Sequence, residues 1–94
     1  MRIWKYDLHK AIEHIEIPWY WRVISVACQE NHPGALISFW AIVDPDTNLH
    51  RRTFHVVETG RELPTEALSF GSLHYLGTGI AHQGSRVLHL FEER

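Results

Sequence analysis

The stretch GALISFWAIVDPDTNLHRRTFHVVETG, residues 34–60, decides the fold. It consists of two apolar runs, both rich in β-branched and aromatic residues, on either side of a polar corner at residues 44–48. In that corner Asp44 can accept hydrogen bonds from nearby backbone N–H groups, and Pro45 presets φ for a type I turn. The stretch therefore predicts a β-hairpin in which residues 35–43 pair with residues 50–58.

Two arginines stand side by side in the second apolar run. Successive side chains of a strand point to opposite faces, so we expect Arg51 to share a face with Thr53 and His55. Arg52 would then lie on the opposite face, together with Phe54. The two arginine side chains cannot both reach one ligand within a single subunit unless the strand is bulged at this point.

The period of two residues continues along the rest of the chain. Further runs of this kind occupy residues 3–8, 13–19, 21–29, 72–78 and 85–91. The runs at 21–29 and 35–43 are apolar on both faces, which is typical of central strands, whereas Pro18 indicates an edge or a strand end. The short connections predict an all-β fold: a small antiparallel sheet of about six or seven strands, curled into a sandwich or an open barrel.

Helical signals are weak, and there is no internal repeat. Residues 8–15 carry apolar residues at spacings that fit either a helix or a strand, and Thr65 could cap one short turn, so we expect at most one short helix. Gly77, Gly79 and Gly84 form a loose pattern without the strand–helix context of a phosphate-binding loop. We expect turns and a β-bulge there instead.

Length and composition indicate one domain, residues 1–94. The chain is 45% hydrophobic and has a net charge of −2, which argues against disorder and against broad nucleic-acid binding. No apolar run is long enough for a membrane helix, and the first ten residues do not resemble a signal peptide. The single cysteine, Cys28, lies in an apolar run, so we expect a buried, unreactive thiol and a reducing cytosol.

Eight histidines are the most unusual count, but they form no His-x-His pair and no helical His-x-x-x-His pair. A metal site could assemble from His55, His74 and His89 only if their strands were neighbours. The sequence has no nucleophile elbow, and we expect Glu92 and Glu93 to be solvated. We therefore predict no catalytic residues, no metal, no cofactor and no enzymatic activity.

The aromatic and arginine residues are more suggestive, above all the run PWYWR at residues 18–22. Alternation puts Trp19 and Trp21 on one face and Tyr20 on the other. Such rings can fill the core, anchor a subunit interface, or stack on a base while arginine holds a phosphate. The candidate ligand-binding residues are Trp19, Trp21, Arg22, Arg51 and His55.

Several segments resemble, in the same order, a family of short phage-encoded proteins with no assigned activity. These segments are IWKYDL, IEIP, ISV, WAIVDPD, TFHVVETGRELP, YLGT and VLHLFEE. In the fifth segment this chain has Glu58 where the family pattern has a small residue. The resemblance implies a viral protein that acts in the host cytoplasm, and it supplies no catalytic residues.

Three functions remain open from the sequence. The lack of a catalytic constellation favours a non-enzymatic homo-oligomer that counteracts host defence by sequestering a small anionic, nucleotide-type signal. A protein-partner inhibitor of a host defence or nuclease complex, acting through an edge strand or an acidic patch, is the first alternative. A histidine-based metal-binding enzyme is the second.

Overall fold

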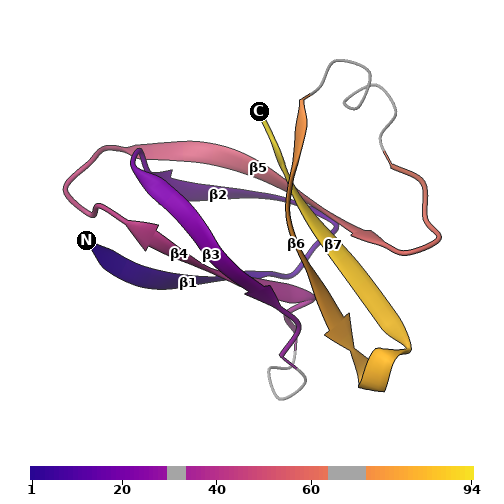
Figure 1. Cartoon of the computed structure of the whole chain (residues 1–94). Coiled ribbons are helices and arrows are strands. Elements are labelled where there is room, and N and C mark those ends of the chain that lie inside the picture. Colours follow the sequence, from indigo (N-terminus) through magenta and orange to yellow (C-terminus); the bar gives the residue numbers. More distant parts are fainter. Residues whose placement is uncertain (30–33, 64–71) are drawn as a thin grey trace.

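The computed structural model describes residues 1–29, 34–63 and 72–94 and confirms the all-β prediction (Figure 1). The strands are β1 (Arg2–Leu8), β2 (Ile12–Pro18), β3 (Trp21–Ala27), β4 (Ile37–Val43), β5 (Leu49–Glu58), β6 (Leu73–Ala81) and β7 (Arg86–Glu93). A 3-10 turn, η1 (His82–Gly84), joins β6 to β7. Residues 8–15, which the sequence left ambiguous, form the end of β1, a turn and the start of β2. The expected cap at Thr65 lies outside the described residues.

Two antiparallel sheets make up the fold. One has three strands in the order β1–β4–β3, and the other has four in the order β2–β5–β7–β6. They pack face to face as an open sandwich, and their core-facing rows meet at Phe39 of β4 and Phe54 of β5, whose ring centroids are 5.1 Å apart. In Figure 1, β2 and β5 lie above β1 and β4.

The predicted hairpin of residues 35–43 with residues 50–58 is wrong. The corner forms a turn as expected, because Asp46 N donates to Asp44 Oδ1 over 3.1 Å and Thr47 N donates to Asp44 O over 3.1 Å. However, β4 pairs with β1 and β3, while β5 pairs with β2 and β7. The turn therefore carries the chain from one sheet to the other, and the two apolar runs stack by their faces instead of pairing by their edges.

The sequence predicted correctly which strand is central for β4 and which is at an edge for β2, but not for β3. β4 is a central strand with four residues of its core face at most 1% exposed, as expected. β3 is an edge strand instead, and Ile24 on it is 48% exposed, so the prediction that both its faces are covered is wrong. Pro18 ends β2, which is an edge strand of the four-stranded sheet, and this agrees with the missing N–H.

The glycines of β6 allow the two sheets to approach closely along one side. A Cβ at Gly77 would lie 2.5 Å from Val26 Cγ2, and one at Gly79 would lie 2.6 Å from Cys28 Sγ. A bulge between Tyr75 and Gly77 accompanies this contact, and Gly84 lies in the η1 turn, so the expected bulge and a turn are both found. Cys28 is half-buried, and burial raises the pKa of its thiol.

No helix in the part of the chain that the structure describes has the length and hydrophobicity needed to cross a membrane.

Candidate functional site

The candidate site lies where the chain changes sheet twice. The connection between β2 and β3 is hydrogen-bonded to the β4–β5 turn: Trp19 N donates to Asn48 O over 2.7 Å, and Asp44 N donates to Tyr20 O over 3.1 Å. Tyr20 N also lies 3.2 Å from Thr47 Oγ1. These bonds fix the backbone that carries the two tryptophans beside the start of β5.

Arg52 lies against both tryptophan rings. Its guanidinium carbon is 5.0 Å from the centroid of Trp21 and 5.9 Å from that of Trp19, which are cation–π distances. Trp21 turns inward and meets the buried ring of Phe54 edge-on, with centroids 6.0 Å apart. Trp19 is 60% exposed and lies beside the imidazole of His50, with centroids 4.6 Å apart. Trp21 is thus part of the core, whereas Trp19 presents its ring to solvent.

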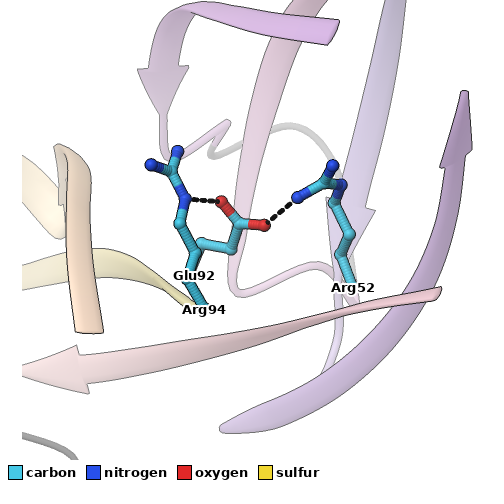
Figure 2. A network of polar contacts seen from close by, with 3 residues as sticks. All are labelled: Arg52, Glu92 and Arg94. Carbon is cyan, nitrogen blue, oxygen red and sulfur yellow. Dashed lines mark hydrogen bonds and ion pairs between the residues drawn. The ribbon is translucent and has the colours of Figure 1, made fainter. Parts of the chain in front are cut away.

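Glu92 on β7 is the anion at the centre of the site. Its side chain is 1% exposed, and its two oxygens each accept a hydrogen bond of 2.8 Å, one from Arg52 Nη1 and one from Arg94 Nε. Figure 2 shows the carboxylate between the two guanidinium groups. A buried carboxylate is stable only when it is paired, and here two cations surround one anion, so the network as a whole carries a positive charge.

Two hollows open on either side of this network. The first, which we name the Trp19 hollow, has a volume of about 250 Å³ and is lined by Trp19, His50, Arg51 and Arg52, among others. The second, which we name the Tyr75 hollow, has a volume of about 290 Å³ and is lined by Trp21, Arg22, Tyr75 and Arg94, among others. Glu92 also lines the Trp19 hollow, and its partner Arg94 lines the Tyr75 hollow, so the network reaches both.

Four of the five residues singled out from the sequence lie at this end of the sandwich. Trp19 and Arg51 line the Trp19 hollow, and Trp21 and Arg22 line the Tyr75 hollow. The structure therefore brings these residues near one charged network but divides them between two cavities.

His55 lies elsewhere. It is 7% exposed, its Nε2 is 2.8 Å from Glu93 Oε2, and it lines a separate hollow of about 400 Å³ with Arg86. The sequence prediction that put His55 beside Arg51 was correct about the face of the strand. It was not correct about a shared site.

The most central residues, Arg52, Glu92 and Arg94, were missed. The expectation that Glu92 is solvated is wrong, because Glu92 is on the same face of β7 as the buried Leu88 and Leu90. The alternation itself could have revealed it: a glutamate on a core-facing row requires a cation, and Arg52 is on the core-facing row of the neighbouring strand.

A short sequence pattern also went unnoticed. The order Arg, any residue, apolar, His, apolar, any residue, Glu occurs at residues 52–58 and again at residues 86–92. The two segments pair antiparallel, with Val56 opposite Leu90 at the same position of both, so a local two-fold axis relates them. This axis relates the pair Arg52–Glu92 to a second ion pair, Arg86–Glu58, at the far end of the two strands. There Arg86 Nε and Nη2 donate to the two Glu58 oxygens over 3.2 and 3.3 Å, and these bonds lower the pKa of Glu58.

The histidines do not form a metal site in the described ranges. His89 is hydrogen-bonded to Thr59 and Thr78 over 2.7 and 2.9 Å, and His55 is bonded to Glu93. No group of three or more His, Cys, Asp or Glu residues within 1–29, 34–63 and 72–94 is placed to hold a metal ion.

The whole chain, residues 1–94, matches the family described as Domain of unknown function (DUF7352), and it belongs to that family. No curated protein and no solved structure matches it.

Proposed function

Starting from this family of unknown function, we propose that the protein is a non-enzymatic binding protein that sequesters a small anionic ligand of nucleotide type. The observation that carries the proposal is the position of Arg52 against two tryptophans, one of which is 60% exposed, next to arginines with unused donors. An exposed indole can stack on a base, and guanidinium groups bind phosphate through charge-assisted hydrogen bonds.

The charge distribution supports an anionic ligand. Arg22, Arg51, Arg52 and Arg94 are four of the nine Lys and Arg residues of a chain whose net charge is −2. Among the described residues, the side chains of Arg22 and Arg51 make no ion pair or hydrogen bond, and both are exposed. Their positive charges are therefore accessible to a ligand.

The biological setting is part of the same proposal. The resemblance to short phage proteins supports a viral protein acting in the host cytoplasm, where removal of a nucleotide signal would counteract a host defence. A homo-oligomer would suit this role, because copies of one chain raise the number of sites per particle.

Titration calorimetry tests the proposal directly. The protein would be titrated with mononucleotides, cyclic dinucleotides, cyclic trinucleotides and cyclic ADP-ribose isomers. We expect heat from at least one compound, and we expect Arg51→Gln and Trp19→Ala each to weaken binding about tenfold. No heat from any compound would reject the proposal.

Two matched variants serve as controls. Arg61→Gln removes an exposed arginine from the opposite end of β5, and Tyr20→Ala removes an exposed aromatic ring from the same turn as Trp19. Both should leave binding unchanged. Weaker binding by Arg61→Gln but not by Arg51→Gln would move the site to the hollow beside Arg86, which Arg61 also lines.

One observation favours a protein-partner inhibitor as the second candidate. The outer face of the three-stranded sheet exposes Ile3 (62%) and Ile24 (48%), and the half-buried Trp40 and Ile42 lie on the strand between them. Exposed apolar surface of this kind is typical of protein contacts. If an affinity-tagged protein retrieves a host protein from infected lysate, and Ile3→Lys abolishes the capture while Arg51→Gln does not, the second candidate replaces the first.

A further inference from the structure

We propose that the Trp19 and Tyr75 hollows together hold a dinucleotide, with one base and one phosphate in each hollow. This inference rests on the proposed function, because it specifies the ligand of the same end of the sandwich. The proposed function does not require a dinucleotide, since a single nucleotide bound in one hollow would fulfil that function equally well.

The two hollows offer the same three groups. Each has an exposed arginine whose side chain makes no polar contact with the described residues, Arg51 in one and Arg22 in the other. Each has an arginine bound to Glu92, and each has an exposed aromatic ring, Trp19 at 60% and Tyr75 at 59%. A ligand with two similar halves would find these three groups in each hollow. The Trp19 hollow is also lined by Glu92 and Glu93, whose carboxylates are paired with Arg52 and His55, respectively.

Tyr75 is positioned for stacking. Its hydroxyl is hydrogen-bonded to Thr78 Oγ1, and its ring meets Phe91 edge-on with centroids 5.7 Å apart. These contacts fix the ring from one side and leave more than half of the residue exposed. A ring that is already held in place costs less conformational entropy when a base stacks on it.

Donors remain available next to Glu92. Arg94 uses only Nε for the carboxylate, and its side chain is 50% exposed, so both of its terminal nitrogens are left for a phosphate in the Tyr75 hollow. Arg52 is 20% exposed, and its buried Nε has no hydrogen-bond partner among the described residues, so it contributes charge more than accessible donors. In the Trp19 hollow, Arg51 must supply the donors.

The volumes argue for a shared ligand. At about 250 and 290 Å³ each hollow is slightly below the range of about 300–1,000 Å³ that drug-sized ligands occupy. Each fits half of a dinucleotide better than the whole. Glu92 is bonded to Arg52, which lines the Trp19 hollow, and to Arg94, which lines the Tyr75 hollow, so this network connects the two (Figure 2). The ligand would cross above the network.

Calorimetry with four probes distinguishes the alternatives: cyclic di-AMP, the linear dinucleotide pApA, ADP and AMP. ADP supplies two phosphates with one base, so it separates a need for charge from a need for two nucleotide halves. We expect at least one dinucleotide to bind about a hundredfold more tightly than AMP or ADP, because the second half binds at high effective concentration. We also expect Arg22→Gln and Arg51→Gln each to weaken dinucleotide binding about tenfold, and Arg61→Gln to leave it unchanged.

Each outcome has one meaning. If AMP or ADP binds as tightly as both dinucleotides, or if Arg22→Gln leaves dinucleotide binding unchanged, the two-hollow inference is wrong and the proposed function stands. If none of the four probes binds but another mononucleotide does, the inference is again wrong. If no nucleotide binds at all, both fall. Arg22 and Arg51 are exposed side chains that make no polar contact with any described residue, so we expect their substitution to leave the fold intact and the comparison valid.

Discussion

Two arginine–glutamate pairs lie at opposite ends of the β5–β7 pair, and the same seven-residue pattern generates both. In the pair Arg52–Glu92 the carboxylate is 1% exposed and the bond is 2.8 Å. In the pair Arg86–Glu58 the side chains are 40% and 30% exposed and the bonds are 3.2 and 3.3 Å. Equivalent positions in equivalent strands have thus become a buried pair and a surface pair.

The difference comes from what covers each pair. Trp19 and Trp21 arrive from the β2–β3 connection and lie over Arg52, and Arg94 occupies the second oxygen of Glu92. The hollow beside Arg86 and Glu58 is lined instead by apolar side chains together with His55, Arg61 and Glu62, and the pair stays accessible. A local pattern determines which charges meet, but segments distant in the sequence determine how strongly they interact.

The largest expected effect separates the two glutamates. Glu92→Ala leaves Arg52, whose side chain is 20% exposed, and the more exposed Arg94 without their anion. We expect it to lower the free energy of unfolding by about 3–5 kcal/mol. Glu58→Ala removes an accessible partner and should cost much less. Urea denaturation of both variants checks this, and equal losses would show that burial does not distinguish the pairs.

The second test concerns the rings that cover the buried pair. Trp21→Ala removes a half-buried ring that contacts Phe39 and Phe54, and we expect a loss of about 2–3 kcal/mol, below the range for a fully buried aromatic. Trp19→Ala should cost less than about 1 kcal/mol, since Trp19 is mostly exposed. Thermal unfolding measures both. A Trp19 variant as unstable as the Trp21 variant would mean that Trp19 serves the fold and is no free platform for a ligand.

The smallest expected effect is the pH dependence of the surface pair. The hydrogen bond from Arg86 holds the pKa of Glu58 below its ordinary value of 4.5. A lowered carboxyl pKa contributes stability above the ordinary value, and this contribution is lost as the pH falls through the folded-state pKa. NMR titration of the Glu58 carboxyl should show its pKa rising toward 4.5 in Arg86→Gln. An unchanged pKa in that variant would contradict the assigned cause.

The strands were predictable from sequence because alternation is a local property. Their division into two sheets was not predictable, because the same sequence pattern, a polar corner between two apolar runs, occurs in a hairpin and in a connection between two stacked sheets. The corner at residues 44–48 joins strands that stack face to face, whereas the corner at η1 joins β6 and β7, which pair by their edges. The choice depends on which other strands occupy the edges of β4, and that is a property of the whole chain.

The candidate site was predictable by residue type more than by position. Trp19, Trp21 and Arg22 were identified because aromatic rings and arginine suit nucleotide binding. Arg52 was not among the candidates, although it shares a face with Phe54, and a charge on an apolar row is itself a sign of a buried ion pair. Arg94 could have been identified in the same way, since it is two residues after Glu92 and the period of two places both side chains on one face.

The hydrogen bonds between the two sheet-changing connections also constrain motion. The bond of Trp19 to Asn48 extends the β2–β5 ladder, and the bond of Asp44 to Tyr20 extends the β3–β4 ladder, so each sheet holds one end of both connections. Sliding of one sheet over the other would therefore have to deform both connections at the same time. Two connections cross between the sheets at the end that carries the tryptophans, and one, from β1 to β2, crosses at the other end, so shear between the layers is resisted more strongly near the tryptophans. A ligand bound near Trp19 would meet a surface that hardly changes shape, so its affinity would reflect fit more than rearrangement.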